Sequence, residues 1–193
     1  MRVVAGLLLL VGSSLAQSVT RFSLTEVSRL FDQTGILKSA SRFFFAVNRD
    51  GSMVSVDLDP SAGGTRQIVD FLRGQTVVVD PKSKSASAFS YRPQRSEEPC
   101  ERRFFFRDAV VSVEKSAGTI QGVAVERVSV DWPDRGGMDV YMAPSLRCQM
   151  LRTISRRNGH ALETRVAQNL RIGDPDSDLF EIPAGYRLTN VTH

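Results

Sequence analysis

The sequence predicts a mainly β (α+β) protein of one domain, in which a single antiparallel sheet curls, or forms an incomplete β-barrel, with a short N-terminal helix. Three observations favour this fold. Runs of β-branched and aromatic residues alternate with polar residues along most of the chain. Turn sequences separate these runs at short intervals, so consecutive strands are expected to pair antiparallel. The length of 193 residues suffices for one sizeable core but not for several large domains.

The first sixteen residues have the pattern of a secretory signal peptide. Arg2 gives a positive start, an apolar run extends over residues 3–11, and Ser14 and Ala16 place small residues where signal peptidase reads them. The apolar run is shorter than the roughly 20 residues that a membrane-spanning helix needs, so no stable membrane span is expected. Residues 1–16 are therefore predicted to direct export, and residues 17–193 to form the single domain in a periplasmic or extracellular location.

Residues 23–34 carry the strongest helix signal in the chain. Ser23 and Glu26 fit a capping box, and Gly35 can end a helix. The apolar residues of this stretch fall on one helical face, namely Leu24, Val27, Leu30 and Phe31. We therefore expect a short, one-sided helix before the first strand.

From residue 41 onward, strand signals dominate. Residues 41–47 and 52–59 flank Asp50-Gly51, which is typical of a hairpin turn. Further strands are expected at 65–72, 75–80, 85–91, 101–114, 119–132 and 138–142.

The last hairpin has the clearest signal. Residues 148–156 and 160–172 flank Asn158-Gly159, the strongest short hairpin sequence. Asp174 is then expected to cap one helical turn that runs through Phe180, before a last short strand near Tyr186.

Cys100 and Cys148 are the only cysteines. In an oxidising compartment an even pair is most simply a disulfide, and a bridge over this separation would stabilise the fold by ~4 kcal/mol. The alternative is a catalytic or redox pair, although neither cysteine lies in a C-x-x-C motif.

Two phenylalanine triplets, residues 43–45 and 104–106, place bulky side chains on both faces of their strands. Each face must then be covered, either by the protein itself as ordinary core or by an apolar guest. Strand parity alone does not say which members of each triplet point inward.

Two stretches of the sequence carry a resemblance to a known family. In residues 68–81 a hydrophobic strand, a tight turn and a second strand lead into Asp80-Pro81, and residues 179–186 read Leu-Phe-Glu-Ile-Pro-Ala-Gly-Tyr. Both resemble the lipoprotein-carrier (LolA-like) superfamily of periplasmic proteins. Ala143-Pro144, Leu146 and Cys148 are also similar to an uncharacterised secreted subfamily. The resemblance implies an incomplete barrel plugged by helices over an apolar cavity.

No catalytic constellation stands out. His160 follows a hairpin turn and His193 is the last residue, so a His-based triad or zinc site has few candidates. Ser112 and Lys115 match a bare S-x-x-K motif, but residues three apart on a strand face opposite sides. Three acidic residues alternate as in a calcium loop without the rest of its pattern, namely Asp174, Asp176 and Asp178. We therefore expect no enzyme activity, no metal and no cofactor.

Three function classes remain open. The first hypothesis is an exported, non-enzymatic protein that binds a hydrophobic ligand, a lipid or an acylated protein, in the concave face of the curled sheet. The residues proposed to line that face are Phe43, Phe45, Phe104, Phe106 and Trp132. The alternatives are an envelope scaffold or protein-interaction module with a packed interior, and an exported enzyme of unknown chemistry. Export argues against nucleic acid as a partner, and the formal charge of +4 favours an anionic envelope component.

Overall fold

The computed structural model describes residues 20–90, 99–100, 104, 106 and 108–191. The predicted signal peptide, residues 1–16, lies outside the described residues. The strand expected at 101–114 is wrong in its first part, because Phe104 lies in a 3-10 turn, Phe106 is outside any strand, and the strand begins only at Val110.

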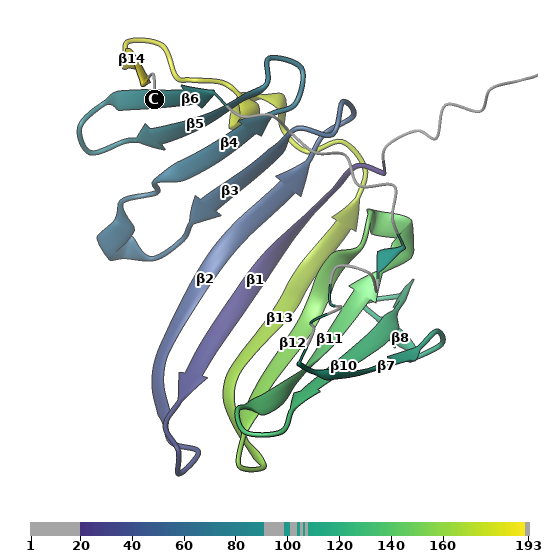
Figure 1. Ribbon diagram of the computed structural model, residues 1–193. Coiled ribbons are helices and arrows are strands. Elements are labelled where there is room, and N and C mark those ends of the chain that lie inside the picture. Colours follow the sequence, from purple (N-terminus) through teal and green to yellow (C-terminus); the bar gives the residue numbers. More distant parts are fainter. Residues whose placement is uncertain (1–19, 91–98, 101–103, 105, 107, 192–193) are drawn as a thin grey trace, which may run out of the picture.

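Within the described residues, strands dominate and the helices are short 3-10 turns (Figure 1). The strands are β1 (Phe22–Phe31), β2 (Leu37–Val47), β3 (Met53–Asp57), β4 (Arg66–Asp70), β5 (Gln75–Asp80), β6 (Ser85–Ser90), β7 (Val110–Glu114), β8 (Thr119–Ile120), β9 (Val123–Ala124), β10 (Glu126–Trp132), β11 (Gly136–Ala143), β12 (Gln149–Arg157), β13 (His160–Ile172) and β14 (Arg187–Val191). The 3-10 helices are η1 (Pro60–Ala62), η3 (Pro144–Leu146) and η4 (Ser177–Phe180).

Twelve of the described strands form one sheet in the order β14-β6-β5-β4-β3-β2-β1-β13-β12-β11-β10-β7. All neighbours pair antiparallel except β14, which runs parallel to β6. The first strand, β1, joins the two halves because it pairs with both β2 and β13. The sheet curls, as Figure 1 shows, but its edges β14 and β7 do not pair with each other. The predicted curled, open sheet is confirmed.

The hairpin turns follow from local sequence. Asn158 and Gly159 both have positive φ, 50° and 78°, which matches the twist of a two-residue hairpin between β12 and β13. Gly51, with φ of 90°, ends the turn between β2 and β3. Both predicted hairpins are confirmed.

The predicted N-terminal helix is wrong, because residues 22–31 form β1 at the centre of the sheet. As a strand, this segment places Phe22 and Leu24 in the core, each about 1% exposed. Its backbone hydrogen bonds go to strands on both sides, and this long-range pairing overrides the local helix signal. The segment is therefore part of the sheet and does not cover either of its faces.

Two further expectations needed correction. The strand expected at 119–132 is broken by a tight turn at Gln121-Gly122, so β8 and β9 form a separate small hairpin before β10 begins. The helical turn near the C-terminus is capped by Asp176, whose side chain accepts a hydrogen bond from the Asp178 N–H at 3.1 Å. Asp174, the predicted cap, pairs instead with Arg21.

The two faces of the sheet are covered by different segments. We call them the Phe45 face and the Phe44 face, after two neighbours on β2 whose side chains point to opposite sides. On the Phe45 face, residues 117–125 and 143–146 pack over the core around Phe22, and Cys100, Phe104 and Ala109 pack over β10 and β11. On the Phe44 face, residues 179–186 pack over β2 to β6.

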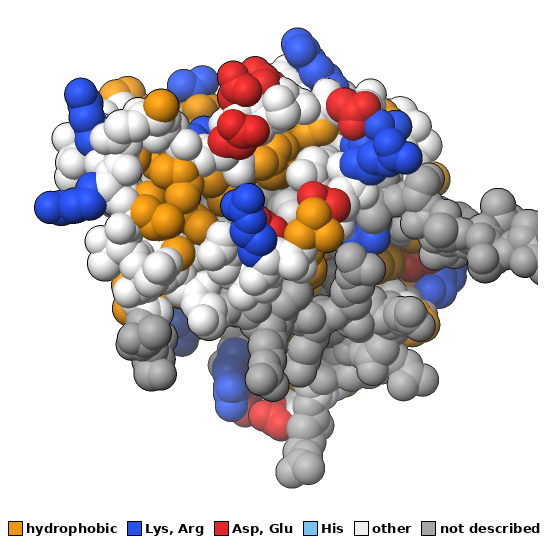
Figure 2. Space-filling view, turned by 90° about the horizontal axis from the view of Figure 1, so that it is seen from above, with side chains coloured by type: hydrophobic (Ala, Val, Ile, Leu, Met, Phe, Trp, Pro, Cys, Tyr) orange, Lys and Arg blue, Asp and Glu red, His pale blue; other side chains and the backbone are white. Residues whose placement is uncertain are grey.

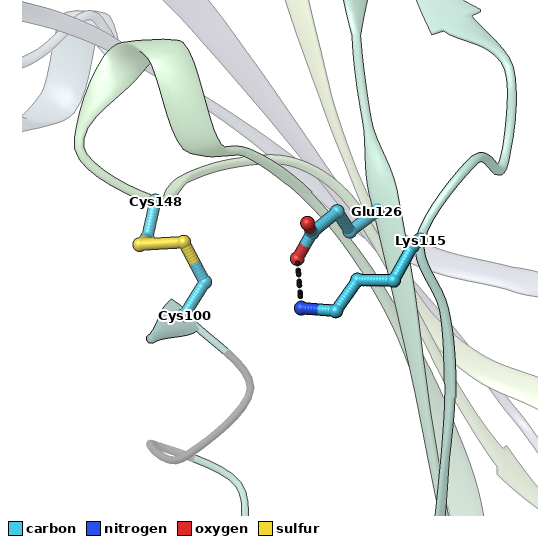
Figure 3. The surroundings of a disulfide bond; sticks show 4 residues. All are labelled: Cys100, Lys115, Glu126 and Cys148. Atoms are coloured by element: carbon cyan, nitrogen blue, oxygen red, sulfur yellow. Dashed lines mark hydrogen bonds and ion pairs between the residues drawn. A yellow bond between two sulfur atoms is a disulfide. The ribbon is translucent and has the colours of Figure 1, made fainter. Parts of the chain in front are cut away.

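The predicted disulfide between Cys100 and Cys148 is confirmed (Figure 3), with a Cα–Cα distance of 5.3 Å. It ties Cys100 to the end of η3, beside the core cluster that contains Met142 and Val130. Close by, Lys115 forms an ion pair of 3.2 Å with Glu126 at the start of β10. The bridge therefore fixes the segment that covers this side of the sheet.

Candidate functional site

The sheet register shows to which face of the sheet the predicted lining residues on strands point. Phe43 and Phe45 point to the same side of β2, and Trp132 on β10 lies on that side too, because the paired rows connect Val128 on β10 with Ser41 on β2. All three therefore belong to the Phe45 face.

Most of these aromatic side chains pack against the protein's own core. The Phe45 ring lies 6.0 Å from that of Phe22, measured between centroids. Phe104 and Trp132 pack against the cluster around the disulfide. Phe43 is half-buried, and its strand neighbours are Glu26 and Asp57. The rings of Phe45, Phe104 and Trp132 are thus part of the internal packing, and their role in binding a ligand stays a prediction.

Phe106 and Trp132 do share a cavity. Their ring centroids are 5.3 Å apart, and Phe106 remains 43% exposed. Together with Met138 and Leu162 they line a cavity of about 510 Å³ at one end of β10 to β13.

A larger cavity, of about 1120 Å³, lies on the Phe44 face at the other end of the sheet. It is enclosed by the loop after β2, the loop between β4 and β5, and the segment that follows β13. We call it the C-terminal cavity, because residues 174–182 form one of its walls. Seen from above, this end of the molecule shows hydrophobic side chains gathered among acidic and basic ones (Figure 2).

The floor of the C-terminal cavity is apolar. Ile68 and Val77 come from β4 and β5, where they are buried, and Phe180 and Ile182 come from the covering segment. Leu72 also lines the cavity and is 75% exposed. A side chain of this type at a cavity mouth offers apolar contact to a bound molecule.

Arg66 holds the covering segment in place. Its Nη1 donates a hydrogen bond of 3.2 Å to the carbonyl oxygen of Asp178, and its Nη2 donates to the carbonyl oxygen of Glu181. The apolar side chains of the segment pack on the sheet beneath: Leu179, Phe180, Ile182 and Tyr186. The wall of the cavity is therefore attached by a few noncovalent contacts.

The rim of the cavity is charged, and most of its carboxylates already have partners. Asp50 accepts a hydrogen bond from the Ser52 N–H at 2.6 Å, and Asp70 accepts one from the Arg73 N–H at 2.8 Å. The side-chain oxygen of Asn48, in contrast, is buried and accepts no hydrogen bond from any described residue. A buried acceptor without a donor is energetically unfavourable, and because this oxygen has almost no accessible surface it is not a contact point for a molecule in the cavity.

A polar cluster interrupts the Phe45 face on β1 and β13. Glu163 accepts hydrogen bonds from Ser28 at 3.1 Å and from the Nε of Arg165 at 2.7 Å. Burial raises the pKa of the Glu26 carboxyl, although Arg165, 3.9 Å away, opposes that shift. The middle of this face is therefore not a continuous apolar trough.

The residues considered for catalysis and metal binding lie apart. His160 is exposed at the start of β13, and Ser112 lies on β7 while Lys115 pairs with Glu126. Within the described ranges, no three His, Cys, Asp or Glu side chains are grouped to hold a metal ion. No helix in the described part of the chain is long and apolar enough to cross a membrane.

The C-terminal cavity was missed at the level of sequence. The signal that the sequence does hold is the run of apolar residues beside acidic ones at 178–182, which is typical of a segment that packs one side on a sheet. Only the complete fold brings this segment next to the loops after β2 and β4. The sequence of the segment itself does not predict that contact.

Comparisons with known proteins show the class of fold to which this open, curled sheet belongs. No protein-family description and no curated protein matches the sequence. Among solved structures, an uncharacterised conserved protein from Thermus thermophilus superposes with a TM-score of 0.56 at 9% identity, over 90% of this chain and 91% of that one. MucB, in the MucA/MucB complex of Pseudomonas aeruginosa, superposes with a TM-score of 0.55 at 17% identity.

The match to MucB covers 89% of this chain but only 59% of the MucB chain. The structural neighbours also include a LolA superfamily protein, NE2245 from Nitrosomonas europaea, at 8% identity and a TM-score of 0.35 over 84% of this chain and 90% of that one. The LolA-like superfamily named from the sequence is thus represented among the structural neighbours. At these identities the likeness concerns the fold alone.

Proposed function

We propose that this protein is an exported, non-enzymatic binding protein that holds the apolar part of a lipid or of an acylated protein in the C-terminal cavity. The observation that carries the proposal is the cavity itself. Its volume of about 1120 Å³ is slightly above the roughly 300–1,000 Å³ typical of ligand pockets, and its floor is apolar. The charged rim suits a ligand with a polar end.

The disulfide supports export, because disulfides persist in oxidising compartments. A disulfide between residues 48 positions apart would also keep the opposite side of the sheet closed while the C-terminal segment moves to admit a ligand. In this proposal, ligand exchange occurs on the noncovalently attached side.

The test begins with the exported protein as purified from the periplasm or medium. Organic extraction followed by mass spectrometry is expected to recover a lipid, and a fluorescent fatty acid is expected to bind the extracted protein. An empty extract together with no probe binding would refute the proposal.

Two variants test whether the fluorescent fatty acid binds in the C-terminal cavity. Leu72→Asp places a charge at the cavity mouth and is expected to weaken fatty-acid binding by about tenfold. Leu188→Asp is the matched control, because Leu188 is 51% exposed on β14 and does not line the cavity. Equal affinities of the two variants would show that the probe binds elsewhere.

A protein partner is the second candidate function, and the likeness to MucB favours it, since MucB is solved as a complex with MucA. In that case the cavity would receive apolar side chains of a polypeptide. A specific protein that co-purifies while the lipid extract stays empty would favour this second function over the first.

A further inference from the structure

The Phe44 face has a second region, over β1, β2, β12 and β13, which is rich in arginine. The register places Arg42, Val27, Val166 and Arg152 in one row across these four strands. Arg29 lies on the same side of β1, two residues beyond Val27. We call this region, Arg29, Arg42, Arg152, Val27 and Val166, the arginine surface.

The three arginines have no carboxylate partner among the described residues. Arg152 lies over the Tyr141 ring, 5.6 Å from its centroid, but forms no ion pair. The nearest carboxylates in the same rows are already engaged. Glu114 pairs with Arg127 at 2.9 Å, and Asp139 accepts a hydrogen bond from Ser129 at 2.6 Å and pairs with Arg156. The surface therefore has uncompensated positive charge.

Of the two valines on this surface, Val27 is buried and Val166 is half-buried. Val27 is only 6% exposed, yet neither Val27 nor Val166 belongs to any of the three core clusters of the described residues. The neighbours of Val27 across the strands are Arg42 and Val166. The arginine stems next to it are long enough to cover it while their charged ends stay in water.

The other half of the same face shows what kind of segment covers it. Residues 174–186 lie there, and they combine apolar side chains with four carboxylates: Asp174, Asp176, Asp178 and Glu181. An arginine of this face, Arg66, donates hydrogen bonds to two of their backbone carbonyls. The covered half includes Phe44, and Arg42 is the next residue on the same side of β2.

We infer that the arginine surface is the docking site for an acidic, extended segment of a partner protein, in which apolar side chains alternate with carboxylates. Such a segment would continue the cover that residues 174–186 provide on the neighbouring strands. Arg42 and Arg152 are three strands apart, about 14 Å, which four or five residues of extended chain span. Arginine suits this role because its guanidinium binds carboxylates through two parallel hydrogen bonds.

An anionic membrane fits the arginine surface less well. Interfacial binders insert protruding apolar side chains below the level of the head groups. Here the apolar side chains lie between arginines, and Val27 is almost fully buried. The surface offers mainly positive charge, with the half-buried Val166 as its apolar contact, and this suits a polypeptide whose carboxylates reach the arginines.

The test uses the full exported chain and a fluorescein-labelled peptide with the sequence of residues 173–183, GDPDSDLFEIP. A neutral peptide, GNPNSNLFQIP, is the matched probe. Fluorescence anisotropy is expected to show binding of the acidic peptide, weaker by at least about tenfold for the neutral peptide and weakened by added salt.

Arg42→Gln/Arg152→Gln is expected to reduce affinity for the acidic peptide by about tenfold. Arg135→Gln/Arg187→Gln, which removes the same charge elsewhere on the surface, is expected to leave it unchanged, and thermal melting checks that both variants fold. Equal loss in both double variants, or loss confined to Arg66→Gln, would overturn the inference. So would binding to vesicles of phosphatidylglycerol and phosphatidylcholine without binding of the peptide, or no binding at all.

Discussion

The two ends of the sheet are covered by segments that are attached in different ways. Over β10 and β11, the covering segment is attached by the Cys100–Cys148 disulfide and packs on residues such as Val130 and Met142, which are fully buried. Over β3 to β5, the covering segment is held by Arg66 and by half-buried apolar side chains. The larger cavity lies at this second, noncovalent end. From this difference we expect that the disulfide-linked end over β10 and β11 supplies more of the stability and that the end over β3 to β5 opens more readily.

Removal of the disulfide should have the largest effect. Cys100→Ser/Cys148→Ser releases the constraint on the unfolded chain, and for a separation of 48 residues the loss is ~4 kcal/mol. Urea unfolding of the variant and of the wild type, with and without reductant, measures it. Fatty-acid binding to the folded variant should persist, because the cavity is at the other end. Unchanged unfolding midpoints would mean that the disulfide-linked end does not contribute this stability.

Truncation of a side chain at each end of the sheet should also show the difference in stability between the two ends, with smaller losses than removal of the disulfide. Met142→Ala removes a side chain with 0% exposure and should lower the free energy of unfolding by about 3 kcal/mol. Phe180→Ala removes a half-buried side chain from the C-terminal segment and should lower it by about half as much, while it enlarges the cavity. Chemical denaturation compares the two, and a larger loss for Phe180→Ala would contradict the ranking.

Arg66→Gln should detach the C-terminal segment locally. It removes two hydrogen bonds to the carbonyls of Asp178 and Glu181, for a loss of about 1–2 kcal/mol. Hydrogen exchange should become faster in residues 177–186 and stay the same near Cys148. Arg73→Gln, at an exposed rim position, is the control. Exchange that increases throughout the sheet would show that this segment does not open independently.

The smallest effect on stability is expected for Glu26, which lies on β1 in the middle of the sheet. The folded state raises the pKa of this carboxyl above 4.5, so the folded state binds its proton more tightly than the unfolded chain does. The associated stability is complete below pH 4.5 and is lost as the pH rises through the folded pKa. Glu26→Gln should therefore gain stability relative to the wild type as the pH rises toward 7. Urea midpoints measured from pH 3.5 to 7.5 test this, and a constant difference would contradict it.

Much of the sheet could be predicted from sequence because its hairpins are local. Asn158-Gly159 and Asp50-Gly51 set their turns through backbone preference, and the flanking residues alternate. β1 could not be predicted in this way. Its helix signal is local, whereas its strand pairing depends on β13, which lies more than 120 residues further along the chain. Only the long-range backbone pairing on both sides decides between the two.

The candidate site was less predictable than the fold. The phenylalanine triplets predict apolar lining without saying which members point inward, and a bulky aromatic residue serves equally as core; Phe45 and Phe104 pack against core clusters. The C-terminal cavity depends on three loops that meet only in the folded chain. The arginine surface likewise depends on register, since Arg42 and Arg152 are 110 positions apart in sequence.

The most direct test of the central claim is to locate a bound acyl chain by photocrosslinking. A diazirine-bearing fatty acid is irradiated with the full exported protein, and the adducts are mapped by mass spectrometry of proteolytic fragments. The proposed function predicts adducts in residues 67–77 and 174–186, at the C-terminal cavity. Adducts confined to fragments that contain Phe43, Phe106 or Trp132 would place the ligand on the Phe45 face and contradict it.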